Sequence, residues 1–339
     1  MNAPPICVQG AGVAALCCLR LLEGQAQPIE TRAEAKRGRL PSILVSPSTQ
    51  KLLADIFRVP HLFDGMPRIR QRVVAWCSRE PVALPHDAVV VSEDALLQLL
   101  NSHLQVPPTH TAAPLDWTIF TARSAPALLS ASHCDFGARS AQIHPVDLAL
   151  HAEPETCWIE SCPQGWLFLL TTGPASGSLL SVGDSAASLL ATSSLIAAKV
   201  QHLHPLAGEF PAHPRTLAQL CAPGWLACGS AAMAFDPLCG EGAGNVAREA
   251  ILACAAVRAI QEGESVEAVL FEYDARLKLG FLRHLENCRD FYVGDFQTEF
   301  WREALRGIEQ GLAWTRDQLV TRQSPKFRLV GFALDRIAT

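Results

Sequence analysis

The sequence predicts an α/β fold that carries an inserted antiparallel sheet and ends in helices. The first part of the chain has an apolar run at 6–9, a glycine-containing turn, an Ala/Leu-rich stretch at 13–22 and an apolar run at 28–31, the order of a strand, a helix and a strand. Residues 156–182 contain apolar runs separated by Gly, Pro and Ser, as in antiparallel strands joined by tight turns. Residues 265–311 show the helical spacing of long C-terminal helices.

These patterns divide the chain into three expected parts. The α/β lobe is assigned residues 1–72, 92–150 and 215–264, the inserted sheet residues 73–91 and 151–214, and a helical C-terminal cap residues 265–339. The division follows the change between helical and alternating hydrophobic patterns along the chain.

Local signals place further elements within these parts. Helices are predicted at 48–57, 93–104, 185–202 and 245–262, and a strand at 225–228. Ser92 is the expected N-cap of the second helix, whose first turn carries acidic residues that favour a helix N-terminus. Asp184 is the expected cap of the helix at 185–202.

The composition excludes several classes of protein. Of the 339 residues, 49% are hydrophobic and 18% are charged, below the roughly 25% charged residues of an average soluble domain. The net charge of -5 argues against a nucleic-acid partner, which would require clustered Lys and Arg. The longest mostly apolar stretch, 179–200, contains Asp184 and several serines, so no transmembrane segment is expected. Because the N-terminus lacks the basic segment of a signal peptide, we expect a cytoplasmic protein.

The cysteines and histidines do not predict a metal site. Twelve cysteines are spread along the chain without a CxxC pair, and the histidines do not supply zinc-ligand spacing. Several cysteines, such as Cys17 and Cys18, lie in apolar stretches, where a thiol behaves as a small hydrophobic side chain. We interpret them as reduced thiols of a cytoplasmic protein.

A glycine turn follows the first strand. Residues 10–15 read Gly-Ala-Gly-Val-Ala-Ala, a GxGxxA pattern. Gly10 permits a tight turn, Gly12 lets the backbone approach a pyrophosphate, and Ala15 allows the helix to pack closely on the strand. The helix N-terminus offers free N–H groups and the positive end of its dipole to phosphates. Glu30 lies about twenty residues after the first glycine, where a carboxylate accepts hydrogen bonds from a ribose.

This combination predicts a dinucleotide site. The residues expected to form it in this part of the chain are Gly10, Ala11, Gly12, Ala14, Ala15, Glu30 and Arg32. A glycine turn that only packs a helix, in some other α/β fold, is the alternative that the pattern leaves open.

A second glycine-rich segment spans residues 224–242 and reads Gly-Trp-Leu-Ala-Cys-Gly-Ser-Ala-Ala-Met-Ala-Phe-Asp-Pro-Leu-Cys-Gly-Glu-Gly. It resembles the GDAAHxxxPxxGxG stretch of the para-hydroxybenzoate-hydroxylase-like flavin monooxygenases and of the flavin-dependent halogenases. Gly229 matches the first glycine, Pro237 the proline, and Gly240 and Gly242 the closing pair. The resemblance implies a Rossmann-like FAD-binding lobe, a substrate lobe built on the antiparallel sheet and a helical cap.

In that family, the segment runs under the ribityl chain and delivers a helix N-terminus to the pyrimidine edge of the isoalloxazine. Reduced flavin carries negative charge there, which free N–H groups and a helix dipole stabilise. The resemblance thus implies that FAD is contacted by Gly229, Ser230, Asp236, Pro237, Gly240, Glu241 and Gly242. We interpret Cys239, in the same segment, as a packed thiol rather than a redox group, because nothing basic adjoins it to lower its pKa.

Two further stretches are similar to the family. Residues 164–170, Gln-Gly-Trp-Leu-Phe-Leu-Leu, resemble the DGWxWxxP strand of the substrate-side sheet. Residues 289–292 and 300–301 resemble the aromatic C-terminal helices of halogenase-like and quinone-cofactor-maturation monooxygenases. Trp166 and Phe168 are therefore the candidates for substrate contact, with core packing as the alternative.

The sequence also departs from the family pattern. Ser230 stands where the family has the Asp that binds the ribityl hydroxyls, and serine offers only a neutral hydrogen bond. Residues 130–134, Ser-Ala-Ser-His-Cys, stand in place of the DATGR motif and lack its Asp. The halogenase WxWxIP signature is matched only in part at 166–171, and no lysine can be assigned the halogenation role. Halogenation is therefore the weaker expectation.

The resemblance implies an FAD-dependent oxidoreductase, a flavoprotein monooxygenase that acts on an apolar or aromatic substrate through a reduced-flavin–oxygen adduct. No catalytic side chain is assigned, because the flavin carries the chemistry. Electrons would come from NAD(P)H or a separate reductase, and the substrate would be a small molecule or an aromatic group carried on a peptide. Two alternatives stay open: a flavin dehydrogenase or reductase of the same fold, and a non-catalytic flavoprotein-fold partner in a biosynthetic assembly.

Overall fold

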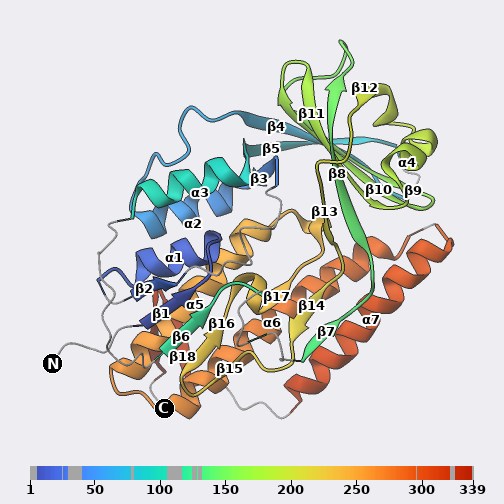
Figure 1. Ribbon diagram of the computed structural model, residues 1–339. Coiled ribbons are helices and arrows are strands. Elements are labelled where there is room, and N and C mark those ends of the chain that lie inside the picture. Colours follow the sequence, from blue (N-terminus) through green and yellow to red (C-terminus); the bar gives the residue numbers. More distant parts are fainter. Residues whose placement is uncertain are drawn as a thin grey trace.

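The structure is a computed structural model that describes residues 6–24, 26–29, 40–77, 80–104, 117–123, 128, 132–294, 296–320 and 325–337. A small sheet with helices beside it lies at one end of the molecule, and a large sheet lies at the other (Figure 1). Two long helices, drawn in orange and red, run along the C-terminal part of the chain (Figure 1). This arrangement confirms the predicted mixture of an α/β lobe with an antiparallel sheet and C-terminal helices.

The small sheet is built from short strands in the order β15, β16, β6, β1, β2. They span Cys221–Ala222, Trp225–Ala227, Trp117–Phe120, Ile6–Gln9 and Ala26–Ile29. β1 pairs in parallel with β2 and β6, and β16 pairs in parallel with β6. Helix α1 (Val13–Leu21) packs against helix α5 (Gly242–Gln261) next to this sheet. Ile6 and Val8 of the central strand are fully buried, as expected for a parallel sheet covered by helices.

The large sheet has the strand order β12, β8, β11, β10, β9, β4, β5, β3, with β13 also paired to β8. In chain order these strands are β3 (Ile43–Val45), β4 (Arg68–Ala75), β5 (Val82–Val91), β8 (Ser140–Leu148), β9 (Thr156–Cys162), β10 (Gly165–Gly173), β11 (Ser176–Gly183), β12 (Val200–Leu203) and β13 (Gly208–Pro211). The antiparallel pairs of β10 with β9 and β11 confirm the strands predicted within 156–182. β4 and β9 pair in parallel.

Three segments assigned to the α/β lobe hydrogen-bond into the large sheet instead: β3, the part of β4 up to Arg72, and β8. β3 pairs antiparallel with β5, and β8 pairs antiparallel with β11. β8 also holds β12 and β13, so the chain enters the large sheet near residue 140 rather than after residue 150. The difference arises because strand pairing joins segments that are distant in the sequence, and no local pattern reports it.

Two of the predicted helices are found with serine caps. α2 (Pro47–Phe57) begins after Ser46, whose hydroxyl accepts a hydrogen bond from the Thr49 N–H. α3 (Glu93–Ser102) begins after Ser92, whose hydroxyl accepts from the Ala95 N–H, as the sequence predicts.

The helix predicted at 185–202 is much shorter. α4 covers only Ala186–Thr192, and its N-cap is Ser185 rather than Asp184. The chain then turns around the buried carboxylate of Glu160, which accepts hydrogen bonds from the N–H groups of Ser194, Leu195 and Ile196. Those N–H groups are the donors that a continuing helix would need. The following residues form β12 on the large sheet.

The C-terminal part contains α6 (Val266–Tyr292) and α7 (Glu299–Leu319). A Cβ atom on Gly307 of α7 would lie 2.6 Å from the carbonyl oxygen of Phe136, so the glycine lets this helix contact the backbone of the chain entering β8. The expected all-helical cap instead ends in the hairpin of β18 (Phe327–Val330) and β19 (Ala333–Arg336). A further small sheet joins β7 (His133–Asp135), β14 (Arg215–Leu217) and β17 (Met233–Ala234). Within the described parts of the chain, no helix is long and apolar enough to cross a bilayer.

Candidate functional site

The first glycine turn links β1 to α1. Gly10 has φ +139, and a Cβ atom there would collide with Oγ1 of Thr121, whose hydroxyl donates to the carbonyl of Gln9. Only glycine fits this close approach of the end of β6 to the end of β1. At Gly12, by contrast, a Cβ atom would meet no atom within 4 Å. The turn therefore packs tightly at its first glycine and faces open space at its second.

The N-terminus of α1 has free hydrogen-bond donors. Gly12 is its N-cap, no side chain caps it, and no acidic residue lies in its first turn. The first N–H groups of a helix need partners outside the helix, and they carry the positive end of its dipole. Ala14 and Ala15 are buried behind this end of the helix. The local structure is therefore suited to an anion such as a pyrophosphate.

The second glycine segment contacts the first directly. Gly229 has φ +59, and a Cβ atom on it would lie 2.8 Å from Cβ of Ala14. It begins the 3₁₀ turn η4 (Gly229–Ala231), which follows β16. The hydroxyl of Ser230 donates to the carbonyl of Thr121 over 3.2 Å, and Thr121 is the residue that crowds Gly10. The fold thus brings together the two motifs predicted from the sequence.

A buried carboxyl group supports this junction. The N–H of Gly229 donates to Oε2 of Glu249 over 2.6 Å, and Glu249 lies on the buried side of α5. Burial raises the pKa of the Glu249 carboxyl to about 8, against the opposing effect of this hydrogen bond. Its Oε1 has no hydrogen-bond partner among the described residues. The Glu249 carboxyl is therefore neutral at moderate pH, and in this form it accepts the hydrogen bond that holds the turn at Gly229.

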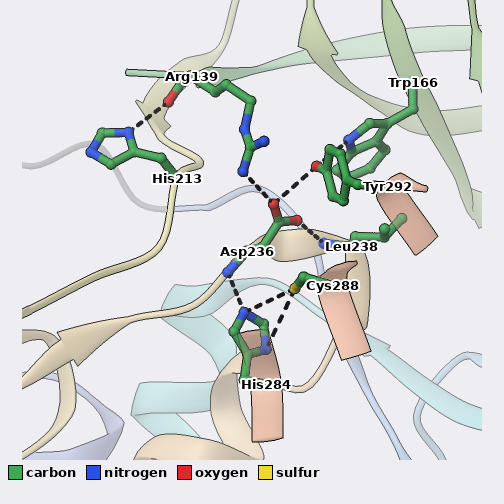
Figure 2. Close-up of polar contacts among 8 residues, drawn as sticks. All are labelled: Arg139, Trp166, His213, Asp236, Leu238, His284, Cys288 and Tyr292. Atoms are coloured by element: carbon green, nitrogen blue, oxygen red, sulfur yellow. Dashed lines mark hydrogen bonds and ion pairs between the residues drawn. The ribbon is translucent and has the colours of Figure 1, made fainter. Parts of the chain in front are cut away.

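The segment continues through a second 3₁₀ turn, η5 (Pro237–Cys239), which Asp236 caps. Oδ1 of Asp236 accepts from the N–H of Leu238, and Oδ2 accepts from Nη2 of Arg139 and from the hydroxyl of Tyr292, each over 2.9 Å. The Asp236 N–H donates to Nε2 of His284 over 2.8 Å. Figure 2 shows Arg139, Tyr292 and the N–H of Leu238 at the Asp236 carboxylate, and His284 at the Asp236 N–H.

The Asp236 network is buried. The Asp236 side chain is 0% exposed and that of Arg139 is 9% exposed. The Arg139 guanidinium lies 4.7 Å from the centre of the Tyr292 ring, and Trp166 Nε1 donates to the Tyr292 hydroxyl over 3.0 Å. Burial, reinforced by the Asp236 charge, raises the pKa of Tyr292, so the phenol stays protonated.

Two residues predicted to touch a ligand therefore have structural partners instead. The Asp236 carboxylate is occupied by protein donors, so it determines the conformation of η5 rather than offering a free charge. Trp166 is 1% exposed and lies 6.5 Å from the ring of Trp76, within an aromatic cluster that includes Tyr292 and Trp301. Phe168 is half-buried and packs on the core. The alternative of core packing holds for Trp166.

The end of the segment leads into α5. A Cβ atom on Gly240, which has φ +63, or on Gly242 would meet no atom within 4 Å. Glu241 is the N-cap of α5 but makes no capping hydrogen bond. Its Oε2 accepts from the Thr49 hydroxyl over 3.2 Å and lies 3.8 Å from Nη1 of Arg248. As at α1, a glycine whose Cβ position faces open space stands at a helix N-terminus that has no side-chain cap.

Some expected residues lie outside this description. Glu30, Arg32 and Ser130 are outside the described residues, as is the side chain of Cys239. Sequence reasoning did not single out Arg139, His284 or Glu249. The sequence contains a signal for Glu249, because it is an acidic residue among the alanines that form the buried face of a helix. Arg139 and His284 had none, since their partner Asp236 is far away in the sequence.

Comparisons with known proteins bear on the fold. No family model matches the chain, and no curated sequence matches it. Among solved structures, the flavin-dependent halogenase CmlS superposes with a TM-score of 0.73 at 16% identity, over 90% of this chain and 68% of that one. The peptidyl tryptophan dihydroxylase QhpG, described as essential for tryptophylquinone cofactor biogenesis, superposes with a TM-score of 0.71 at 18% identity, over 99% of this chain and 86% of that one.

A third solved structure is aklavinone-11 hydroxylase in a ternary complex with FAD and aklavinone. It superposes with a TM-score of 0.60 at 13% identity, over 86% of this chain and 69% of that one. These identities show a shared fold. The resemblance inferred from the two glycine segments is thus confirmed at the level of the fold, since flavin-dependent halogenases and hydroxylases have it.

Proposed function

We propose that the protein is an FAD-dependent oxidoreductase of the monooxygenase type that acts on an apolar or aromatic substrate. One observation carries this proposal: the N-termini of α1 and α5 have no side-chain cap, and each has a glycine, Gly12 or Gly242, whose Cβ position faces open space. The contact of Ala14 with Gly229 joins the two glycine segments. A dinucleotide with a flavin at one end requires such a pair of anion-stabilising sites.

The residues fit FAD part by part. The N-terminus of α1 at Gly12 would hold the pyrophosphate, and the Ser230 hydroxyl, close to Thr121, would lie along the ribityl chain. The N-terminus of α5, after Gly240 and Gly242, would face the pyrimidine edge of the flavin. Bound there, the flavin would supply electron transfer and oxygen activation. The chain itself would bind, orient the substrate and exclude water.

The substrate and the electron donor belong to the same proposal. Flavin-dependent halogenases, a peptidyl tryptophan dihydroxylase and an aklavinone hydroxylase share the fold, which supports a small-molecule or peptide-borne aromatic substrate. We also propose that electrons come from NAD(P)H or a separate reductase, and that the protein is cytoplasmic. The buried thiols of Cys17, Cys18 and Cys254 support that location, since such unpaired thiols persist in a reducing compartment.

The experiment is a titration of the purified protein with FAD and with FMN, followed by visible absorbance and calorimetry. FAD should bind in preference to FMN, because the α1 site would recognise a pyrophosphate that FMN lacks. Gly12→Asp places a charged side chain in the open space in front of α1 and should abolish FAD binding. Gly280→Asp makes the same change at an exposed glycine of α6, where a Cβ atom also meets nothing, and should leave binding unchanged.

If the wild-type protein binds neither flavin at tens of micromolar, the oxidoreductase proposal is wrong. The non-catalytic partner of a biosynthetic assembly would then be the better account of this fold. If FAD binds but its reduced form does not consume oxygen in turnover with any donor, the dehydrogenase or reductase alternative replaces the monooxygenase.

A further inference from the structure

Two buried glutamates of the chain differ in the hydrogen-bond donors around them. Glu160, on β9, is 3% exposed and accepts from three backbone N–H groups and from two serine hydroxyls. Glu249, on α5, is 5% exposed and, within the described part of the chain, accepts only from the N–H of Gly229. A buried carboxylate requires several donors or a cation. Glu160 therefore has the surroundings of a charged group, and Glu249 has those of a neutral one.

The groups that face Glu249 supply no positive charge. Its charge acts on Cys228, directly before η4, and on Tyr273 of α6. Cys18 of α1 and Cys254 of α5 lie next to Cys228. Burial, followed by the charges of Cys228 and Glu249, raises the pKa of the Tyr273 phenol. Protonated thiols and a protonated phenol are neutral, so none of these neighbours stabilises an ionised Glu249.

Charged side chains on the helices packed against α5 have partners of their own. These pairs are, on α1, α2 and α6 in turn, Arg20 with Glu23, Lys51 with Asp55, and Arg276 with Glu272. β19 also contacts α5, and its Arg336 pairs with Glu264 beyond the C-terminal end of that helix. Arg248 precedes Glu249 on α5, but adjacent residues of a helix do not face each other, and its side chain is 48% exposed. Burial thus raises the pKa of the Glu249 carboxyl to about 8, against the hydrogen bond from Gly229.

The turn at Gly229 connects Glu249 to the helix end proposed for the pyrophosphate. Glu249 accepts from the Gly229 N–H over 2.6 Å, and a Cβ atom on Gly229 would lie 2.8 Å from Cβ of Ala14. Ala14 is in the first turn of α1, whose N-cap is Gly12. Helices α1 and α5 pack against each other beside β16 (Figure 1). The Glu249 carboxyl group therefore lies behind the first turn of α1.

We propose that Glu249 is a positioning residue that must carry a proton for FAD to bind, so that FAD binding takes up a proton from solvent at alkaline pH. This inference rests on the proposed function, which places the pyrophosphate at the N-terminus of α1. The neutral carboxyl holds the Gly229 turn against Ala14 and adds no charge. Once ionised, it would place a negative charge in a poorly solvated interior, close to the negative charges of the pyrophosphate, where like charges repel strongly.

Linkage gives the direction of the effect. A bound pyrophosphate would raise the pKa of the Glu249 carboxyl further, so the FAD complex keeps its proton at a pH at which the free protein has lost it. FAD affinity should therefore be constant well below pH 8 and should fall above it. The fall is at most about tenfold per pH unit, the limit for a single proton.

The test is a calorimetric titration of the full-length protein with FAD at pH 6.5, 7.5, 8.5 and 9, a range in which the FAD phosphates stay ionised. The wild-type Kd should rise above pH 8. Glu249→Gln keeps an acceptor for the Gly229 N–H and cannot ionise, so its Kd should not change with pH. Glu262→Gln is the matched control, because it removes a carboxylate from the exposed C-cap of the same helix, and it should keep the wild-type profile. Titrations at pH 8.5 in two buffers of different ionisation enthalpy should show proton uptake in the wild type and in Glu262→Gln, and none in Glu249→Gln.

A measurement on the wild-type protein alone makes the test independent of the folding of the variants. Carbon NMR of protein labelled at its glutamate carboxyl groups should show one glutamate that titrates near pH 8 without FAD and at a higher pH with FAD. A pH-independent Kd in the wild type, the same profile in a folded Glu249→Gln, or no such glutamate signal would overturn the inference, while FAD binding itself leaves the proposed function intact. Absence of FAD binding at every pH would instead refute the proposed function and this inference with it.

Discussion

The hydroxyl of Tyr292 donates to the carboxylate of Asp236 over 2.9 Å, which joins the last turn of α6 to the turn before α5. Arg139, the residue before β8, binds the same carboxylate oxygen. One buried charge therefore holds together the large sheet, the glycine segment and the C-terminal helices (Figure 2). If the N-terminus of α5 faces a flavin, the position of this helix depends on that charge.

Tyr292→Phe should destabilise the protein more than Tyr273→Phe. The Tyr292 hydroxyl bonds a carboxylate and accepts from Trp166, whereas the equally buried Tyr273 hydroxyl donates to the neutral carbonyl of Ala227. Hydrogen bonds to charged groups contribute about 1.5–3 kcal/mol, against about 0.5–1.5 kcal/mol for neutral ones. Urea denaturation of both variants measures the difference in the free energy of unfolding. Equal losses would mean that the Asp236 bond contributes no more than an ordinary buried hydroxyl.

Glu249 predicts a pH dependence of stability. The unfolded chain releases this proton near pH 4.5, while the folded protein keeps it to about pH 8. Between these values the folded state binds more protons than the unfolded state, so the free energy of unfolding falls as the pH rises, by up to about 1.4 kcal/mol per pH unit. Glu249→Gln preserves the acceptor for the Gly229 N–H and cannot ionise. Thermal unfolding at pH 5, 6.5 and 8 should therefore show a weaker decline for the variant, and parallel curves would contradict this assignment.

Much of the fold could be predicted because its signals are local. Gly10, Gly12 and Ala15 lie in one turn; the structure shows a close contact at Gly10, a buried position at Ala15 and open space in front of Gly12. The strands within 156–182 were recognisable because turn residues separate short apolar runs. The end of α4 was not predictable in this way. The carboxylate that takes its N–H groups, Glu160, belongs to another strand.

The candidate site shows the same limit. The glycines could be placed from spacing alone, but the partners of Asp236 come from β8 and α6 and meet only in the folded chain. Trp166 was a reasonable candidate for substrate contact by its position on β10. In the structure, however, Trp166 contacts the Tyr292 hydroxyl and the ring of Trp76, and no sequence pattern indicates these contacts.

Ser230→Asp should tighten FAD binding. The resemblance to flavin monooxygenases places an aspartate here, and the Ser230 hydroxyl now donates to the carbonyl of Thr121. A carboxylate at this position would bind the ribityl hydroxyls through charge-assisted hydrogen bonds, worth about 1.5–3 kcal/mol at best. Calorimetric titration with FAD measures the gain. Ser230→Asn, similar in shape but uncharged, should gain less, and unchanged affinity in the aspartate variant would show that this residue does not face the ribityl chain.

Gly242→Val should lower the reduction potential of the bound flavin. Gly242 begins α5, and its missing side chain leaves open space in front of the helix N-terminus. A valine there would separate the N–H groups from the flavin, and the anionic reduced form would lose more stabilisation than the oxidised form. The pyrophosphate site at α1 is separate, so FAD should still bind. Potentiometric titration of the FAD-loaded variant measures the change, with Gly280→Val on α6 as the control. An unchanged potential at normal FAD content would mean that α5 does not point at the isoalloxazine.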